Sequence, residues 1–226
     1  MIKSVLTYSF GKNTDSLREP LVIDPDTEYI CVTDNTELKS DVWHFVYQDF
    51  SELNTDRDKF ASVKFNPFAY ISTNRVCVID STLEIKYSPK ELFDLLNQSD
   101  MIFKKHPIRN SLGEELPVWF SRGLSAESFY KFLNTAFFDR IDMYSVPLLE
   151  SCLFLLNKNS VSIELMHRTM EYLKLLGSDK KFIPTNQCPL SYVIHRFYKN
   201  KVGIIDVNIQ RKFFNRYHHN GEINLT

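Results

Sequence analysis

The stretch Arg75-Val76-Cys77-Val78-Ile79-Asp80 (RVCVID) decides the fold class. Its apolar, largely β-branched run is typical of a strand that is buried on both faces of a parallel sheet. The run ends on the carboxylate of Asp80, and in open α/β sheets ligands bind beyond the carboxyl ends of the strands. A carboxylate at that point is placed to hold a hard cation against a diphosphate. The alternative, equally compatible with the sequence, is that Asp80 only caps a turn.

Short apolar runs alternate with longer amphipathic ones along the chain, which is the pattern of an α/β protein. We predict further strands at Ser4–Phe10, Glu28–Thr33, Trp43–Gln48, Asp100–Lys104 and Ser151–Leu156. We predict helices that begin at Ser88-Pro89 and that cover Leu124–Asp139, Ser162–Leu176 and Asn186–Tyr198. Because the 226 residues contain no internal repeat and no clear linker, we expect one compact α/β domain over residues 1–226.

The composition excludes several classes of protein. Hydrophobic residues make up 43% of the chain and aromatic residues 14%, which argues against disorder. Only six glycines are present, so a glycine-rich phosphate loop is not expected. The sequence has no GxSxG, HExxH, Walker A or GxGxxG motif, so serine hydrolases, zinc proteases, P-loop NTPases and Rossmann oxidoreductases have no motif support.

The four cysteines, Cys31, Cys77, Cys152 and Cys188, are far apart, and no CxxC pair exists. Three of them lie in apolar runs, so we expect reduced, buried thiols and no zinc site. The N-terminus lacks the apolar core of a signal peptide, and no stretch approaches the roughly 18 apolar residues of a membrane span. These features predict a cytoplasmic protein without a membrane span.

Basic residues concentrate near the C-terminus, although the net charge is only −1. From His195 to His219 there are six Lys or Arg residues and one acid. Arg211, Lys212 and Arg216 are interleaved with aromatic residues, a combination that holds phosphates and stacks bases. The alternatives are a solvated surface or the last packed helix of the domain.

A second basic group follows the predicted strand Asp100–Lys104. Lys104, Lys105, His106 and Arg109 bring four potential cations together within six positions. Such a cluster neutralises phosphate or positions a sugar, and arginine offers a planar, bidentate fork. An exposed basic loop is the alternative reading of the same residues.

Two polar pairs occur later in the chain. The side-chain amides of Asn186 and Gln187 are suitable hydrogen-bond partners for sugar hydroxyls, whereas helix capping by Asn186 is the alternative. His218 and His219 are potential metal ligands, whereas a pair of exposed polar residues is the alternative.

Taken in order, these segments resemble a family of GT-A-fold glycosyltransferase-like proteins found in bacteria, viruses and plants. The plant members are linked to pectin and mucilage polysaccharide, and the family is distantly similar to the family 8 retaining glycosyltransferases. The resemblance covers most of the chain and is carried by Leu17–Pro20, Tyr29–Asn35, Trp43, Lys64, Pro67, Val78–Ser81, His106-Pro107, Arg109 with Glu114 or Glu115, Glu150 and Gln187–Tyr192. It implies a single GT-A-like (Rossmann-like) domain with a central, mostly parallel sheet flanked by helices, in which residues 195–226 complete the active site or the acceptor side.

The resemblance implies that the chain binds a nucleotide-diphosphate-sugar donor, most simply a UDP-sugar. Tyr8, Phe10 and Asp34 would border the nucleotide, because the first strands of a GT-A sheet form the pocket for the donor base. Lys64 would face the diphosphate or the transferred sugar, and His106 would contribute to the same donor site.

The resemblance also implies a divalent metal ion, Mn or Mg. Asp80 would stand for the first acid of the metal-binding DxD pattern, and His218 or His219 would complete the metal site. The sequence departs from this pattern, because Ser81-Thr82 follows Asp80 and the second acid is missing. A hydroxyl is a weaker ligand than a carboxylate, so the metal is expected to bind weakly or to be dispensable.

Three residues would take part in the transfer step itself. Arg109 would face the diphosphate or the sugar, while Glu150 and Gln187 would lie near the anomeric carbon or the acceptor hydroxyl. Asn186 stands where the family has an aspartate, and an amide cannot act as a general base. This departure favours a retaining mechanism in which the leaving diphosphate helps to deprotonate the acceptor and Gln187 only steers it.

The function expected from the resemblance is therefore that of a hexosyl- or pentosyltransferase acting on a hydroxyl acceptor. The acceptor is a saccharide, a protein or, as a sharper variant, hydroxymethylated bases in phage DNA modified in the host cytoplasm. A hydroxymethyl group projects into the major groove, where an enzyme can reach it. The alternative is a binding module with a GT-A fold that has lost its chemistry.

Overall fold

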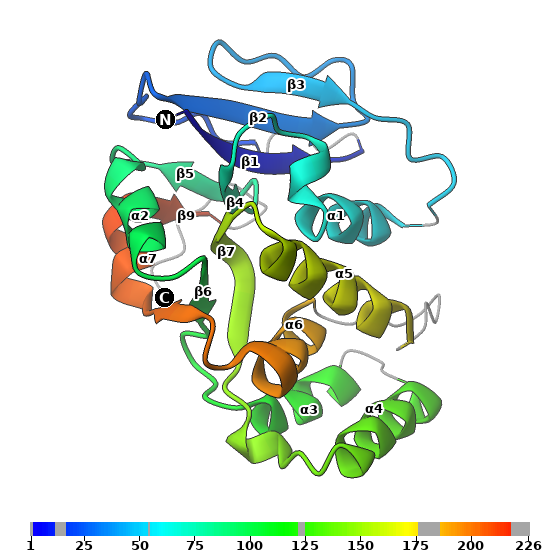
Figure 1. The fold of residues 1–226 in the computed structure, drawn as a ribbon. Coiled ribbons are helices and arrows are strands. Elements are labelled where there is room, and N and C mark those ends of the chain that lie inside the picture. The colour runs from blue at the N-terminus through cyan, green and yellow to red at the C-terminus, as the bar shows by residue number, and fades with distance from the viewer. Residues whose placement is uncertain (1, 12–16, 54, 122–124, 176–185, 218–226) are drawn as a thin grey trace.

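The computed structural model describes residues 2–11, 17–53, 55–121, 125–175 and 186–217. Its main sheet has seven strands in the order β3-β2-β1-β4-β7-β6-β8 (Figure 1). The strands are β1 (Lys3–Ser9), β2 (Thr27–Thr33), β3 (His44–Tyr47), β4 (Arg75–Ile79), β6 (Met101–Lys105), β7 (Leu149–Asn157) and β8 (Gly203–Ile205). All neighbours pair in parallel except β7, which is antiparallel to both β4 and β6. The predicted fold class, an α/β protein with a mostly parallel central sheet, is confirmed.

The RVCVID stretch forms the centre of this sheet, as its composition predicts. Strand β4 pairs with β1 on one side and with β7 on the other. Val76, Cys77 and Val78 are completely buried, because helices cover both faces of the sheet at this point. Asp80 follows the last residue of the strand and therefore lies at the carboxyl edge of the sheet.

Helices α1 (Asp56–Lys64), α5 (Ser160–Leu175) and α6 (Gln187–Val193) lie on one face of the sheet, as Figure 1 shows. Helices α2 (Lys90–Asp94) and α7 (Val207–Phe213) lie on the other, with a second sheet of two strands, β5 (Leu83–Ile85) and β9 (Phe214–Arg216). Alternate residues of β4 enter two separate hydrophobic clusters, Val76 and Val78 on one face and Cys77 and Ile79 on the other.

A third cluster lies beyond the carboxyl end of β6. Helices α3 (Leu112–Ser121) and α4 (Ala126–Phe138) pack there against α6, around the buried side chains of Trp119, Phe132 and Tyr192. Short 3-10 turns occur at Pro67–Ala69, Leu95–Asn97 and Met143–Ser145, and a π-helical turn, Ile194–Tyr198, extends α6.

Several details differ from the sequence expectation. The helix expected at Ser88-Pro89 begins at Lys90, with Pro89 as its N-cap, while the Ser88 hydroxyl accepts a 3.3 Å hydrogen bond from the Lys90 amide. The sequence does not predict helices α1 and α3 or strands β5, β8 and β9, because each is short and its apolar residues show no clear period. Helix α7 agrees with the alternative in which Arg211 and Lys212 belong to a packed helix. Helix α1 nevertheless has a local start signal, since the Thr55 side chain caps the amide of Asp58.

All four cysteines are buried and free, as expected. Burial raises the pKa of the Cys31 thiol to about 12, so this thiol stays protonated at neutral pH. Within the described part of the chain, no helix has both the length and the apolar character needed to cross a membrane.

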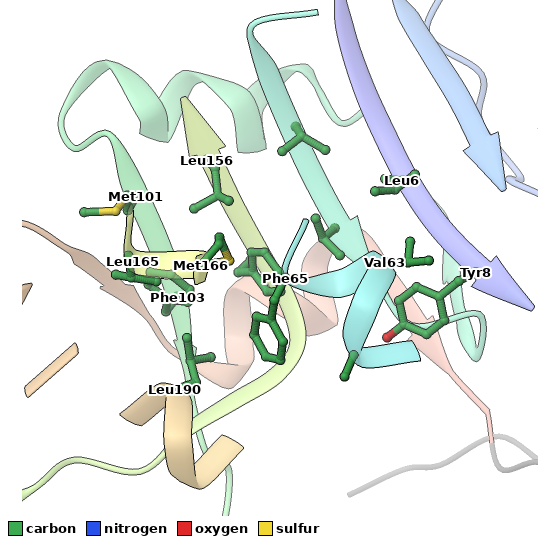
Figure 2. Close-up of a cluster of buried hydrophobic side chains, with 14 of the residues drawn as sticks. Leu6, Tyr8, Val63, Phe65, Met101, Phe103, Leu156, Leu165, Met166 and Leu190 are labelled. Carbon is green, nitrogen blue, oxygen red and sulfur yellow. The ribbon is translucent and has the colours of Figure 1, made fainter. Parts of the chain in front are cut away.

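The largest hydrophobic cluster lies between the sheet and the helices α1, α5 and α6 (Figure 2). Phe154 of β7 stacks with Phe103 of β6 at 5.6 Å and with Phe65, which follows α1, at 6.5 Å between ring centroids. Phe154 thereby ties the antiparallel strand to its neighbour and to the first helix.

Replacing Phe154 by alanine should therefore lower the free energy of unfolding by about 3–5 kcal/mol, the usual cost of truncating a buried phenylalanine. Phe138→Ala is the matched control, because Phe138 is 81% exposed and its loss should cost less than about 0.5 kcal/mol. Urea unfolding followed by circular dichroism measures both values. Equal effects of the two substitutions would contradict the packing described here.

Candidate functional site

Charged and polar side chains converge at the carboxyl edge of the main sheet. Tyr8 comes from the end of β1, Asp80 follows β4, and Lys104 lies near the end of β6. Because β7 runs in the opposite direction, its first residues reach the same edge and contribute Glu150. The edge is where an open α/β sheet offers a crevice to a ligand.

Asp80 is held by two donors from different elements. Its Oδ1 atom accepts hydrogen bonds from the Tyr8 hydroxyl and from Lys64 Nζ, the latter at 2.8 Å. Lys64 is the last residue of α1, and its side chain is only 6% exposed, whereas that of Asp80 is 33% exposed. Burial alone would raise the pKa of Asp80, but Lys64, Tyr8 and Arg216 together lower it below its usual range. Asp80 is therefore a carboxylate at neutral pH and fixes the Lys64 ammonium beside it.

Glu150 is the anion of a second, more deeply buried group. Its Oε2 atom pairs with Lys104 Nζ, and its Oε1 atom lies 2.7 Å from the Arg216 guanidinium. The Lys104 side chain is completely buried. Burial would raise the pKa of Glu150, but Lys104 and Arg216 outweigh this effect and lower it. Both oxygens of Glu150 are thus neutralised, so it is a partner of cations and not a free base.

A shift in strand register brings Lys104 and Glu150 together. Phe103 pairs with Phe154, but the next residue, Lys104, pairs with Glu150. Bulges of this kind turn a side chain away from the direction that strict alternation would give it. The Cys152 Sγ atom lies 4.0 Å from Lys104 Nζ, and the Cys152 carbonyl accepts a 2.9 Å hydrogen bond from the Asp80 amide. The irregular part of β7 therefore joins the two charged groups.

The C-terminal strand β9 delivers Arg216 to the same place. Strand β9 pairs with β5 in antiparallel fashion, with Arg216 opposite Leu83. The Leu83 amide donates to the Asp80 carbonyl at 2.9 Å, so Arg216 is anchored close to Asp80. Its positive charge contributes to the lowered pKa of Asp80 as well as that of Glu150. The Arg216 guanidinium therefore pairs with Glu150, and its charge also acts on Asp80.

The basic group after β6 continues the site towards α6. The His106 ring accepts from the amides of Ile108 (3.2 Å) and Arg109 (3.0 Å) through Nδ1, and the Arg109 guanidinium lies 3.0 Å from Nε2. Arg109 also forms an ion pair with the buried carboxylate of Glu115, and Gln187 Nε2 donates to Glu115 at 2.9 Å. The alternative of an exposed basic loop is wrong for His106 and for Lys104, which are buried. The structure thus brings Arg109 and Gln187 together through Glu115.

Burial lowers the pKa of His106 to about 4, and the neighbouring charge of Arg109 acts in the same direction. His106 is therefore a neutral imidazole at pH 7. It orients the loop after β6 by accepting two backbone hydrogen bonds and is not itself a cation of the site.

Two of the residues expected to border the nucleotide have other partners. Phe10 is 5% exposed and packs against Phe50 and Phe60, so it belongs to the hydrophobic core. Asp34 accepts from the Gly11 amide at 2.9 Å and pairs with Lys59 at 2.6 Å. Gly11 has a φ of 75°, a conformation that glycine adopts readily, and Asp34 holds this turn in place.

The described residues do not suit a divalent metal ion. In the part of the chain that the structure describes, no three His, Cys, Asp or Glu side chains are grouped to hold a metal. Asp80 Oδ1 already accepts from an ammonium group and a phenol, and Ser81 follows in place of a second acid. His218 and His219 lie outside the described residues.

Three members of the site received no role, or a different one, from the sequence. The sequence groups Lys104 with Lys105, His106 and Arg109 as one basic cluster, and it groups Arg216 with Arg211 and Lys212 as a contact for phosphates and bases. Glu115 enters only as one of two glutamates, Glu114 or Glu115, in a block that carries the resemblance. The position of Lys104 at the end of an apolar strand is a weak signal that this lysine is buried. No neighbouring residue indicates the role of Arg216, because its partner Glu150 lies on a distant strand.

No protein-family model matches this sequence, and no curated protein matches it. Among solved structures, the glycosyltransferase GlyE of Streptococcus pneumoniae TIGR4 aligns with 91% of this chain at 9% sequence identity and a TM-score of 0.46. The chain spans 45% of that protein's length. At this identity no residue roles transfer, so we assign roles from the contacts of this chain alone.

Glu150→Gln should destabilise the fold by about 3–5 kcal/mol, because it leaves the ammonium of Lys104 buried without a charged partner. Adding Lys104→Met to this substitution should recover part of the loss, with a coupling of about 1–3 kcal/mol in a double-mutant cycle of urea unfolding. The exposed pair Glu127–Lys131 is the control, and Glu127→Gln should leave stability unchanged. Strict additivity of the two buried substitutions would show that they do not interact.

The depressed pKa of His106 makes stability depend on pH in a defined window. The unfolded chain takes up a proton at this residue below about pH 6.5, whereas the folded protein resists protonation until about pH 4. The contribution of His106 is therefore complete above pH 6.5 and is lost as the pH falls towards 4. His106→Asn keeps a side-chain acceptor for the two amides but removes the titration, so its stability should fall less between pH 7 and pH 5. Urea midpoints with the same pH dependence in both proteins would refute this assignment.

Proposed function

We propose that this chain is a glycosyltransferase that moves a sugar from a nucleotide-diphosphate donor, most simply a UDP-sugar, to a hydroxyl acceptor. The observation that carries the proposal is the row of ion pairs along the carboxyl edge of the sheet, in which Lys64, Arg216 and Arg109 are each fixed by a carboxylate. Fixed cations at this edge suit a ligand with several negative charges. The ordered resemblance to GT-A glycosyltransferases supports the same class of donor.

The arrangement suits the charge changes of glycosyl transfer. When the anomeric bond breaks, negative charge grows on the leaving diphosphate, and cations that are already in place stabilise it without reorganising. The three cations lie on different elements, α1, β9 and the loop after β6, so together they can surround an extended anion. The hydroxyl of Tyr8 also donates to Asp80, the carboxylate that holds Lys64, and so helps to keep both side chains in place.

Glu150 does not serve as a base in this proposal, because both of its oxygens are paired with cations. It positions Arg216 instead. Asn186, at the N-cap of α6, has no side-chain capping bond, and as an amide it cannot remove a proton. A retaining transfer, in which the leaving diphosphate accepts the proton of the acceptor hydroxyl while Gln187 orients that hydroxyl, is the mechanism most compatible with these residues.

The acceptor is proposed only as a hydroxyl compound, with a saccharide or protein preferred over hydroxymethylated DNA. The DNA variant rests on Arg211, Lys212 and Arg216 acting as one basic surface. Arg216 instead contacts Glu150, and Lys212 lies 2.5 Å from Glu91. Two of the three basic residues on which the DNA variant depends therefore pair with two different glutamates.

Donor binding tests the proposal directly. A panel of nucleoside diphosphates and nucleotide sugars should contain at least one that raises the thermal stability, by about 2.7 kcal/mol at a hundredfold excess over its dissociation constant. Asp80→Asn should abolish this shift, because the Lys64 ammonium loses the charge that fixes it, whereas Asp94→Asn, at an exposed position, should retain it. For ligands that bind, release of the nucleoside diphosphate reports turnover. If no member of the panel stabilises the protein, the transferase proposal fails and a binding module is the better description.

A further inference from the structure

Two fixed cations, Lys64 and Arg216, lie near Asp80, the residue at which the DxD pattern would place a divalent metal ion. Lys64 contacts Asp80 at 2.8 Å, and Arg216 contacts Glu150 at 2.7 Å. Arg216 also lies close to Asp80, because it is paired in the β5–β9 sheet with Leu83, whose amide donates to the Asp80 carbonyl at 2.9 Å. These two cations come from α1 and from the C-terminal strand β9, which lie far apart in the sequence.

A divalent ion bound at Asp80 would compete with charges that are already there. It would share the Asp80 carboxylate with the Lys64 ammonium, which already occupies Oδ1, and like charges on one carboxylate repel each other. Glu150 offers no alternative ligand, because Lys104 takes one of its oxygens and Arg216 the other. The chemistry of these donors therefore favours an anion beside the cations over a second cation among the carboxylates.

Part of this group of charges is accessible from solvent. The Arg216 side chain is 29% exposed and that of Asp80 is 33% exposed, so this part of the site opens to solvent. A guanidinium carries five N–H donors, more than its contact with Glu150 requires, and its planar shape matches phosphate oxygens. Four cations (Lys64, Lys104, Arg109 and Arg216) face three carboxylates (Asp80, Glu115 and Glu150), which leaves an excess of one positive charge.

We infer that Arg216 and Lys64 form a diphosphate-binding subsite that works without a divalent metal ion, with Arg216 as its principal contact. The identification of the anion as a diphosphate rests on the proposed function, but the binding of the anion does not. Glu150 and Asp80 are positioning residues in this subsite, since each holds one cation. The C-terminal strand β9 thereby becomes part of the donor site.

Isothermal titration of the whole chain with inorganic pyrophosphate tests the inference. Binding should be measurable in EDTA, and Mn²⁺ should not improve it. Arg216→Gln and Lys64→Met should each weaken it by at least about tenfold, the size of one charge-assisted contact. Arg216→Lys should keep part of the affinity, because the charge remains and the fork is lost. Lys212→Gln, a charge loss in the neighbouring helix at an exposed pair, should leave affinity unchanged.

Three results would overturn the inference. These are pyrophosphate binding that requires Mn²⁺, no binding under either condition, or unchanged affinity in a folded Arg216→Gln protein. Thermal melting of each variant shows whether it is folded, and Arg216→Gln leaves Glu150 paired with Lys104. The two proposals fail separately. Pyrophosphate binding in EDTA without any response to nucleotide sugars would support the subsite and refute the transferase, whereas nucleotide sugars that bind only with Mn²⁺ would support the transferase and refute this subsite.

Discussion

Lys104 is a completely buried lysine, and its charge constrains much of the surrounding structure. An ammonium group removed from water needs a carboxylate beside it, and Glu150 meets that need only because β7 runs antiparallel to its neighbours. The register shift between β6 and β7 then aligns the two side chains. Glu150 has a second oxygen, which fixes Arg216 and with it the C-terminal strand. One buried charge thus links the main sheet to β9, the last strand that the structure describes.

The same pairing decides what the site can do. Carboxylates that are paired with cations are poor bases and poor metal ligands. The cationic side chains that they hold, in turn, have fixed positions. Preorganised cations stabilise a developing negative charge without the cost of reorienting solvent. The buried ion pairs contribute little net stability compared with apolar residues of similar size. They lie at the edge where an open α/β sheet offers a crevice to a ligand.

Much of the sheet was predictable from the sequence, because strand signals are local. The apolar runs Arg75–Asp80 and Glu28–Thr33 identify strands within one or two residues, and the burial of Val76 to Val78 follows from their composition. Short elements such as β9 carry too few residues to show a period. Phe10 illustrates a different limit, since an aromatic residue at a strand end has the same sequence signature whether it packs in the core or faces a ligand.

The sequence by itself determined the α/β class and the position of Asp80 at the carboxyl edge, because both depend on consecutive residues. Only the tertiary structure decided which charges meet. Lys64, Glu150 and Arg216 belong to a helix, an antiparallel strand and the C-terminal strand, and nothing within any one of these segments specifies its partner. Ion pairing depends on distances of a few ångströms and on exclusion of water, and both arise only when the sheet brings remote segments together.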